Sequence, residues 1–416
     1  MTFKKLLSMV TLAGVLSVVS ISGAVSPAHA TGNAPMVLTF EVTNGTTITL
    51  PLTTSGSPSV DWGDNVSNNS FTHTYSGSTR TVTVSITEDP QFPIVGFGAW
   101  SWQGSEELRT VQSWGDLTLF SLNAAFNDCD GLTSVPNYLP ATVTDLRYAF
   151  SESDSNPPEV TQWNTHNVTN MGGMFFSAPN FNQDISSWDT SNVTNMDYMF
   201  SRTFAFNRDL SSWDIRNLQS AQNIFSTSVI SAHNLSKLVY LWWYKPHQQN
   251  VHFGATGRSI YQAASGAVED FTLLDGWTFS FSSSILPSAQ ISVTSFPTAS
   301  AVTVGQTIGS STLTGGASVP GTFVFASPST PVALGNQIAL VLFIPDSFAY
   351  IPIEFQISVT GVAVQGSPSI TPSPVTTPAS TLAQTGTQTE SLLQIVWIML
   401  TLGCLLLGFK VRRIFH

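Results

Sequence analysis

Apolar residues recur with a fixed period in the middle of the chain, between Trp163 and Phe225. The period is 25 residues, and polar or small residues fill most of the positions between the apolar ones. A unit of this length cannot bury its own apolar face, so the pattern predicts a solenoid in which each coil packs on the next. The expected core columns are Trp163, Trp188 and Trp213; Val168, Val193 and Leu218; and Phe175, Phe200 and Phe225.

The same period extends towards the N-terminus in a weaker form. Phe150 lies 25 residues before Phe175, and Phe126 lies 24 residues before Phe150. Trp114 and Tyr138 are expected to take the tryptophan position of these earlier coils. The sequence therefore predicts about five coils.

The recurring phrases of these coils are N-V-T-N-M-x-x-M-F and F-N-Q-D-x-S-S-W-D. They resemble the BspA-like repeats of bacterial surface proteins, which are distant relatives of leucine-rich repeats. The resemblance is close for the two central coils and covers less than half of the chain. It implies a surface location and a solenoid fold more than a defined reaction, and it assigns residues 97–280 to a BspA-like solenoid with a C-terminal cap.

The cap is expected where the period fails, beyond Phe225. Residues 235–243 can form a helix, and residues 261–268 a second one, before the sequence L-L-D-G-W-T-F. Caps of the resembled family end with a similar G-W-T. We interpret Trp242 and Trp243 as core residues of this cap, and the alternative is a platform for a sugar ring.

Period-2 alternation precedes the solenoid. Short runs such as V-L-T-F-E-V and R-T-V-T-V-S-I, separated by Gly, Ser and Asn, predict a small β-sandwich over residues 31–96. Its V-D-W-G-D and T-H-T-Y segments resemble a PKD-type domain. Asp61, Asp64 and His73 could hold a metal ion, but three ligands without a fourth favour a structural role for aspartates in tight turns.

Alternation returns after the cap. The runs I-S-V-T, T-F-V-F, I-A-L-V-L-F-I and I-E-F-Q-I-S-V resemble the Ig-like modules of bacterial surface proteins and assign residues 286–365 to such a domain. Asp346 and Glu354 are the charged residues of this stretch, which leaves little for catalysis and favours a spacer.

The N-terminus has the pattern of a secretory signal peptide, residues 1–30. Lys4 and Lys5 precede an apolar run, and Ala28-His29-Ala30 supplies the small residues that a signal peptidase needs. We expect cleavage before Thr31. The alternative is a helix that stays in the membrane as an anchor.

The C-terminus resembles a Gram-positive sortase signal, residues 382–416. A Ser/Thr/Pro-rich linker, 366–381, leads to it, and an apolar transmembrane segment, 392–409, and a basic tail follow the motif. The resemblance implies sortase as a partner and peptidoglycan as the point of attachment, whereas the alternative is a plain stop-transfer helix. The motif is Leu382, Ala383, Gln384, Thr385 and Gly386, with Ala383 where the commonest version has proline.

Charge is sparse and acidic, with 14 basic and 25 acidic residues in the whole chain. This balance argues against nucleic-acid binding, which needs clustered Lys and Arg. Cys129 would be the one cysteine of the mature chain, and we interpret it as a buried small residue. Without Lys4, Lys5, Glu390, Lys410, Arg412 and Arg413, the mature chain keeps 9 basic and 24 acidic residues, a net charge near −15.

The repeats also provide an internal test for catalysis, because each coil is a control for the others. Asp184 and Asp209 share one position, and Asp189 and Asp214 another, so these carboxylates are expected to form a turn in each coil. His166 has no counterpart that carries an imidazole. The sequence also has no glycine-rich phosphate loop, no G-x-S-x-G and no Cys-His metal set, so we expect neither an enzyme nor a cofactor.

Together these patterns predict a mainly β multidomain protein: PKD-like sandwich, solenoid with cap, Ig-like sandwich, and C-terminal transmembrane helix. We expect a secreted, cell-wall-anchored surface protein in which the solenoid binds a host or cell-surface ligand, either protein or glycan. The alternative is a passive structural stalk or coat protein, and a carbohydrate-active enzyme ranks third.

Overall fold

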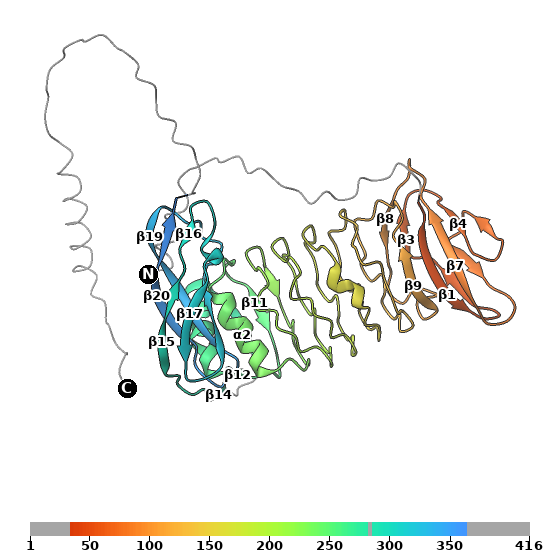
Figure 1. Cartoon of the computed structure of the whole chain (residues 1–416). Coiled ribbons are helices and arrows are strands. Elements are labelled where there is room, and N and C mark those ends of the chain that lie inside the picture. The colour runs from red at the N-terminus through yellow and green to blue at the C-terminus, as the bar shows by residue number, and fades with distance from the viewer. Residues whose placement is uncertain (1–33, 282–284, 364–416) are drawn as a thin grey trace, which may run out of the picture. The chain divides into compact units, whose positions relative to one another are not determined.

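The computed structural model describes residues 34–281 and 285–363, and Figure 1 shows their arrangement. These residues are mainly β, with two α-helices. None of the helices in the described ranges is long and apolar enough to cross a membrane. The expected signal peptide, linker, sorting motif and membrane segment 392–409 lie outside the described residues.

The N-terminal domain is an antiparallel sandwich. Its larger sheet has the strand order β5-β4-β7-β1-β9, and β2 pairs with β6 and β3 with β8. Alternate residues of β7 are buried, as the period-2 pattern predicts. The strands are β1 (Met36–Val42), β2 (Thr47–Thr49), β3 (Leu52–Thr54), β4 (Ser59–Asp61), β5 (Ser67–Asn68), β6 (Thr72–Thr74), β7 (Arg80–Thr87), β8 (Ile94–Phe97) and β9 (Leu108–Ser113).

The structure shows no break at the expected boundary between residues 96 and 97, because the parts on either side of it share strands. β9 lies beyond that boundary, yet it pairs with β1, with Phe40 opposite Leu108. Gly96 in β8 makes a parallel bridge to Ser121 in the first coil. The buried side chains of sandwich, coils and cap form one continuous hydrophobic cluster from Met36 to Trp277.

The coils stack through a ladder of parallel bridges that uses few residues in each coil. The bridges join Ser121 to Asp145, Asp145 to Asn170, Asn170 to Asn195 and Asn195 to Ser220. Figure 1 shows the coils as a row of similar turns between the sandwich and α2. The ladder then continues as a parallel sheet of β10 (Ser220–Ala221), β11 (His252–Gly254) and β13 (Thr278–Ser280).

The phenylalanine column runs through the interior of the stack. Successive rings from Phe126 to Phe225 have centroids 5.0 to 5.7 Å apart. All nine column residues predicted from the period are buried. They are Trp163, Trp188, Trp213, Val168, Val193, Leu218, Phe175, Phe200 and Phe225.

The tryptophan column shows one departure from the prediction. The indole Nε1 of Trp188 donates to the carbonyl of Val160 at 2.9 Å, and that of Trp213 to Ile185 at 3.0 Å. Tyr138, however, is 48% exposed and does not fill the tryptophan position. Its backbone carbonyl accepts from Trp114, whose ring contacts Trp163 directly at 6.4 Å, so no side chain is needed between them.

Two helices close the solenoid. α2 (Ala232–Trp243) begins where the Ser231 hydroxyl accepts from the Asn234 backbone N–H. α3 (Ser265–Asp275) lies later in the chain than the helix expected over residues 261–268. It ends at Gly276, whose left-handed φ of 69° terminates it. Short 3-10 helices lie at Pro158–Gln162 and Gln262–Ala264.

The cap explains how two adjacent tryptophans are both packed. Trp242 is buried, with its ring 6.0 Å from that of Phe253 in β11. Trp243 points elsewhere and is partly buried, with its ring 5.0 Å from Phe271 of α3. α3 therefore covers the face of α2 that the coils leave open.

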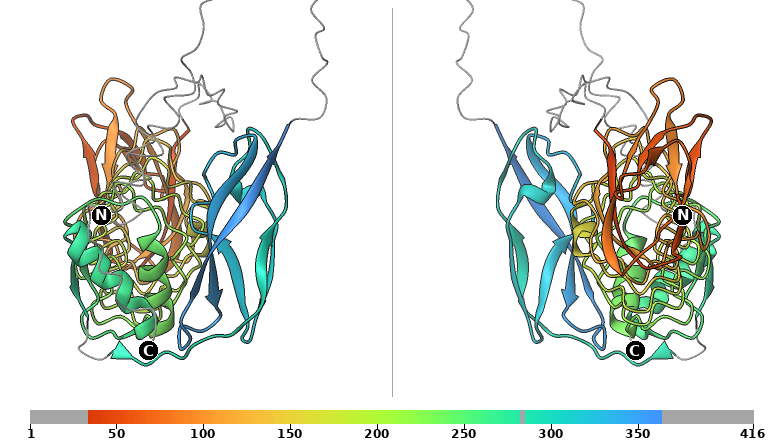
Figure 2. Two further views of the ribbon diagram at one scale, coloured as in Figure 1. Left: turned by 90° about the vertical axis from the view of Figure 1, so that its left-hand side faces the viewer. Right: turned by 90° about the vertical axis from the view of Figure 1, so that its right-hand side faces the viewer.

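The C-terminal domain is a second sandwich, drawn in blue tones in Figure 2. One sheet has the order β16-β20-β19-β18, and β15 pairs with β17. Before this sandwich begins, β12 (Ile260–Tyr261) pairs with β14 (Ile285–Leu286). The other strands are β15 (Val293–Ala299), β16 (Val302–Thr303), β17 (Leu313–Ala317), β18 (Gly321–Phe325), β19 (Gly335–Pro345) and β20 (Ile353–Val362), with a 3-10 helix at Ile308–Ser310.

Candidate functional site

One outward position of the coils alternates between large and small residues. It lies three residues after each ladder residue, and its backbone has a φ between 54° and 62° in every coil. We call it the outer position. Its residues are Ala124, Tyr148, Gly173, Tyr198 and Asn223, so an aromatic ring stands in every second coil.

The small residues of the outer position provide room for the rings. Neighbouring coils in a parallel ladder lie about 4.8 Å apart. A Cβ added to Gly173 would lie 2.1 Å from Cε1 of Tyr148, so the Tyr148 ring covers that glycine. Trp100 also contacts this ring, at 4.8 Å between centroids and with the two planes inclined at 52°, although the coil of Ala124 lies between the two in sequence.

A second pair of rings lies further along the stack. Phe176 and Tyr198 meet edge to face, with centroids 6.5 Å apart. The guanidinium of Arg202 lies over the Phe176 ring at 5.8 Å. We call Trp100, Tyr148, Phe176 and Tyr198 the aromatic strip. Trp100 is 53% exposed and the other three are partly exposed, so their rings can be reached from solvent.

The two tyrosines of the strip are held in a strained backbone conformation. Tyr148 has φ 54° and Tyr198 φ 58°, a region that bulky L-residues rarely adopt and that costs about 1 to 3 kcal/mol. The equivalent residues Gly173 and Asn223 adopt it with less strain, so the coil does not need tyrosine there. Because the left-handed conformation recurs in every coil, at Ala124 as well as at the tyrosines, it belongs to the turn of the repeat. The exposure of the rings is what makes the strip a candidate site.

Polar groups border the strip, and the charged side chains among them sum to one negative charge, that of Asp128. The Ser101 hydroxyl donates to Asp128 at 2.6 Å, and Arg147 is paired with Asp145 at 2.9 Å. Exposed Glu152 and Arg202 contribute one charge of each sign. Within the described part of the chain, neither the Tyr148 nor the Tyr198 hydroxyl makes a hydrogen bond, so both are available to a ligand.

The repeated aspartates stabilise turns on another face of the coils. Asp184, Asp189, Asp209 and Asp214 each accept the backbone N–H two residues further on, at 2.9 to 3.1 Å. Hydrogen bonds from Ser186 lower the pKa of Asp184. The interpretation of these carboxylates as turn residues is confirmed.

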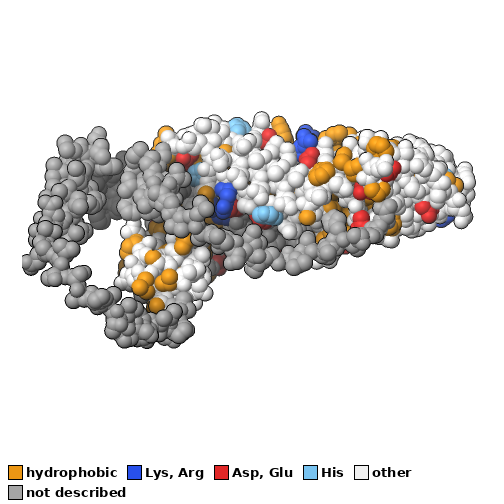
Figure 3. Space-filling model, turned by 90° about the horizontal axis from the view of Figure 1, so that it is seen from above, with side chains coloured by type: hydrophobic (Ala, Val, Ile, Leu, Met, Phe, Trp, Pro, Cys, Tyr) orange, Lys and Arg blue, Asp and Glu red, His pale blue; other side chains and the backbone are white. Residues whose placement is uncertain are grey.

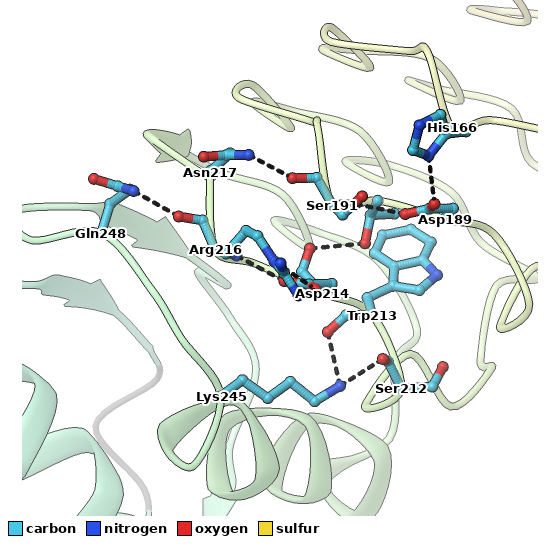
Figure 4. Close-up of polar contacts among 11 residues, drawn as sticks. His166, Asp189, Ser191, Ser212, Trp213, Asp214, Arg216, Asn217, Lys245 and Gln248 are labelled. Atoms are coloured by element: carbon cyan, nitrogen blue, oxygen red, sulfur yellow. Dashed lines mark hydrogen bonds and ion pairs between the residues drawn. The ribbon is translucent and has the colours of Figure 1, made fainter. Parts of the chain in front are cut away.

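Figure 4 shows how this face is linked from coil to coil. The Asn217 amide donates to the Ser191 carbonyl of the preceding coil at 2.7 Å, and Gln248 donates to the Arg216 carbonyl. Lys245 of the cap donates to the carbonyls of Ser212 and Trp213. Burial lowers the pKa of this lysine to about 8. Lys245 and Gln248 of the cap thus donate hydrogen bonds to carbonyls of the last coil, as side chains of a further coil would have done.

An open pocket of about 540 Å³ lies on the aspartate face. Its polar groups are engaged within the protein: Asp184 and Asp209 in their turns, Ser212 with the Ser186 carbonyl, and Arg208 with the Asn182 carbonyl. These side chains stabilise the coils, so the pocket offers few free groups for a ligand. It is lined by Asp184, Ser186, Ser187, Asn207, Arg208, Asp209 and Ser212.

The possible metal ligands of the first sandwich have structural partners. His73 bonds to Asp64 at 2.8 Å and stacks on Trp62, with centroids 5.2 Å apart. Asp61 accepts the Gly63 backbone N–H. Across residues 34–281 and 285–363, no group of three or more His, Cys, Asp or Glu side chains is placed to hold a metal ion.

The site residues predicted from the sequence lie elsewhere. The nine column residues form the interior of the solenoid, where no ligand reaches them, and Leu382 to Gly386 fall outside the described residues. The aromatic strip was not predicted. Its signal was present in the 50-residue spacing of Tyr148 and Tyr198, which is two periods, but the glycine between them hides it in a coil-by-coil alignment.

One family model matches the part of the chain that contains the coils. A family model described as "Mycoplasma protein of unknown function, DUF285" matches residues 120–238. The match covers the coils that carry Tyr148, Phe176 and Tyr198, and it stops within α2. No curated protein and no solved structure matches the chain.

Proposed function

We propose that the chain is an exported, cell-wall-anchored surface protein whose solenoid binds a ligand through the aromatic strip and thereby mediates adhesion. Export rests on the signal-peptide pattern of residues 1–30, and anchoring on the sorting motif Leu382 to Gly386 with the apolar segment 392–409. Sortase would be the processing partner, and peptidoglycan the anchor.

The observation that carries the binding role is the strip itself. A solenoid needs its internal columns in order to fold, but it does not need exposed rings on its outer turns. Trp100, Tyr148 and Tyr198 are exposed or partly exposed, and two of them are in a left-handed conformation that glycine or asparagine would adopt more easily. Exposed aromatic side chains that are already ordered bind partners at a small entropic cost.

Figure 3 shows one face of the molecule. Most of the visible surface is uncharged, and hydrophobic side chains gather in more than one region of it.

The alternative, a passive stalk, is favoured by the second sandwich, where Asp346 and Glu354 are the charged residues between 289 and 364. This domain is suited to a spacer. The second sandwich can act as a spacer while the solenoid binds a ligand, because these are different domains. An adhesion assay shows whether the whole protein is more than a passive stalk.

The test is adhesion by bacteria that display the full-length chain. A non-adherent host carrying the chain should attach to epithelial cells or to neighbouring bacteria, and the combined variant Trp100→Ala, Tyr148→Ala, Tyr198→Asn should lose attachment at equal surface amount. Display without any gain of attachment would support the passive stalk. An isolated fragment 97–280 is unsuitable, because it would separate β9 from β1.

A further inference from the structure

We infer that the ligand of the aromatic strip is a linear, uncharged polysaccharide that lies across the coils, parallel to the stacking direction. This inference rests on the proposed function, since it names the ligand class of the same strip. It follows from the spacing of the rings, the charge around them and the hydrogen-bonding groups that they leave free.

The spacing favours a polymer with a repeating unit. Tyr148 and Tyr198 occupy equivalent positions two coils apart, which corresponds to about 10 Å along the stack. Trp100 and Phe176 each pair with one of these tyrosines and enlarge its surface. The strip therefore offers two ring pairs at an interval of two coils, and successive units of one polymer chain can reach both.

The chemistry of the platforms favours sugar rings. A pyranose ring has a face of C–H groups that packs on an aromatic face, and its hydroxyls point outward to polar neighbours. The Tyr148 and Tyr198 hydroxyls are free within the described structure, and two carboxylate acceptors border the strip, Asp128 bonded to the residue after Trp100 and Glu152 bonded through its backbone N–H to the Phe176 carbonyl. The rings of each pair are inclined to one another, at 52° for Trp100 and Tyr148 and at 81° for Phe176 and Tyr198, so each pair presents a ring face beside a ring edge.

Electrostatics disfavour an anionic polymer. The exposed Glu152 and Arg202 beside the strip cancel, Arg147 is neutralised by Asp145, and Asp128 leaves one negative charge at the border of the strip. The chain as a whole carries a formal net charge of −11, so its field repels anionic polymers. Hyaluronan and similar acidic glycans are therefore excluded as the expected ligand.

The experiment uses the chain from residue 31 to 381, which contains every described element. Hexasaccharides of β-1,4-linked glucose, N-acetylglucosamine, mannose and xylose are titrated by calorimetry, together with hyaluronan and a proline-rich peptide. We expect at least one neutral hexasaccharide to bind at least tenfold more tightly than its disaccharide, because it reaches both platforms. Its affinity should change less than twofold between 0.05 and 0.5 M salt, since no ion pairs form.

Two substitutions separate binding from folding. Tyr198→Asn introduces the residue that the equivalent position has at Asn223, so the melting temperature should stay equal or rise, while the affinity falls at least tenfold. Phe204→Ala is the matched control, because Phe204 is an aromatic residue of the coils that is 56% exposed and lies outside the strip. It should leave the affinity unchanged.

The outcomes distinguish this inference from the proposed function. If no neutral hexasaccharide binds, or if hyaluronan or the peptide binds instead, the polysaccharide assignment is wrong, and the adhesion assay still decides whether the strip binds another partner. If a hexasaccharide binds equally to wild type and Tyr198→Asn, the sugar site lies elsewhere and the inference also fails.

Discussion

The Tyr148 ring occupies the space in which a side chain at residue 173 would lie, because a Cβ on Gly173 would be 2.1 Å from the ring carbon Cε1. An outward ring in one coil is thus matched by a missing side chain in the next. This pairing shows that the two coils are adapted to each other on their outer surface as well as in their core.

Gly173→Ala tests this relationship. The new methyl group would displace the Tyr148 ring and would place an alanine at φ 62°, so we expect a loss of about 1 to 2 kcal/mol in the free energy of unfolding. The effect should shrink in the background Tyr148→Ala, because the ring is then absent. Equal losses in both backgrounds, measured by urea denaturation, would mean that the ring does not contact Gly173.

Phe200→Ala tests the phenylalanine column. Phe200 is fully buried and stacks on Phe175 and Phe225 at 5.7 and 5.6 Å, so its removal leaves a cavity between coils. We expect a loss of about 3 to 5 kcal/mol in unfolding free energy, measured by urea denaturation of the chain 31–381.

His166→Ala is the surface comparison for that measurement. His166 bonds to Asp189 at 2.8 Å, but both side chains are exposed, so the pair should contribute less than about 0.5 kcal/mol. Similar losses for Phe200→Ala and His166→Ala would contradict the assignment of inward and outward positions.

Lys245→Met tests the end of the stack through pH. Burial lowers the pKa of Lys245 to about 8, whereas the unfolded chain keeps its proton up to about 10.5. Between these values the unfolded state binds more protons, so the stability contributed by Lys245 rises with pH from 8 to 10.5. The difference in unfolding free energy, wild type minus Lys245→Met, should therefore increase across this window. A difference that stays constant, or decreases, would show that the lysine is not desolvated in the fold.

Thr385→Ala tests the proposed anchoring. By resemblance to sortase substrates, the enzyme's thiolate attacks the Thr385 carbonyl, releases the fragment that begins at Gly386, and passes the acyl group to an amine of the wall precursor. The variant should stay in the membrane fraction and be extracted by detergent, and it should be absent from the material that muramidase releases. Variant protein still joined to peptidoglycan fragments would leave a plain membrane anchor as the better interpretation of the tail.

The mature N-terminus provides a separate check on export. The Ala28-His29-Ala30 pattern predicts cleavage before Thr31, so N-terminal sequencing of surface material should begin at Thr31. Material that still contains residues 6–25 would show that the segment serves as a membrane anchor.

Much of the interior could be predicted from the sequence. Each coil buries the same positions, so Trp188, Val193 and Phe200 recur with the period of the fold. These features depend on contacts between equivalent residues, which the residue pattern contains.

The tertiary structure decided what depends on contacts between different positions. β9 joins β1 across about 70 residues of sequence, and the exposed Tyr138 is replaced in the core by direct contact of Trp114 with Trp163. The aromatic strip is of the same kind: Trp100 meets Tyr148 beside the small residue Gly173, and Phe176 meets Tyr198 of the next coil, through contacts between different positions of the coils. The period determines which side chains point inward, because burial of apolar surface is shared by every coil, whereas the use of the outward side chains depends on the distance and register between coils.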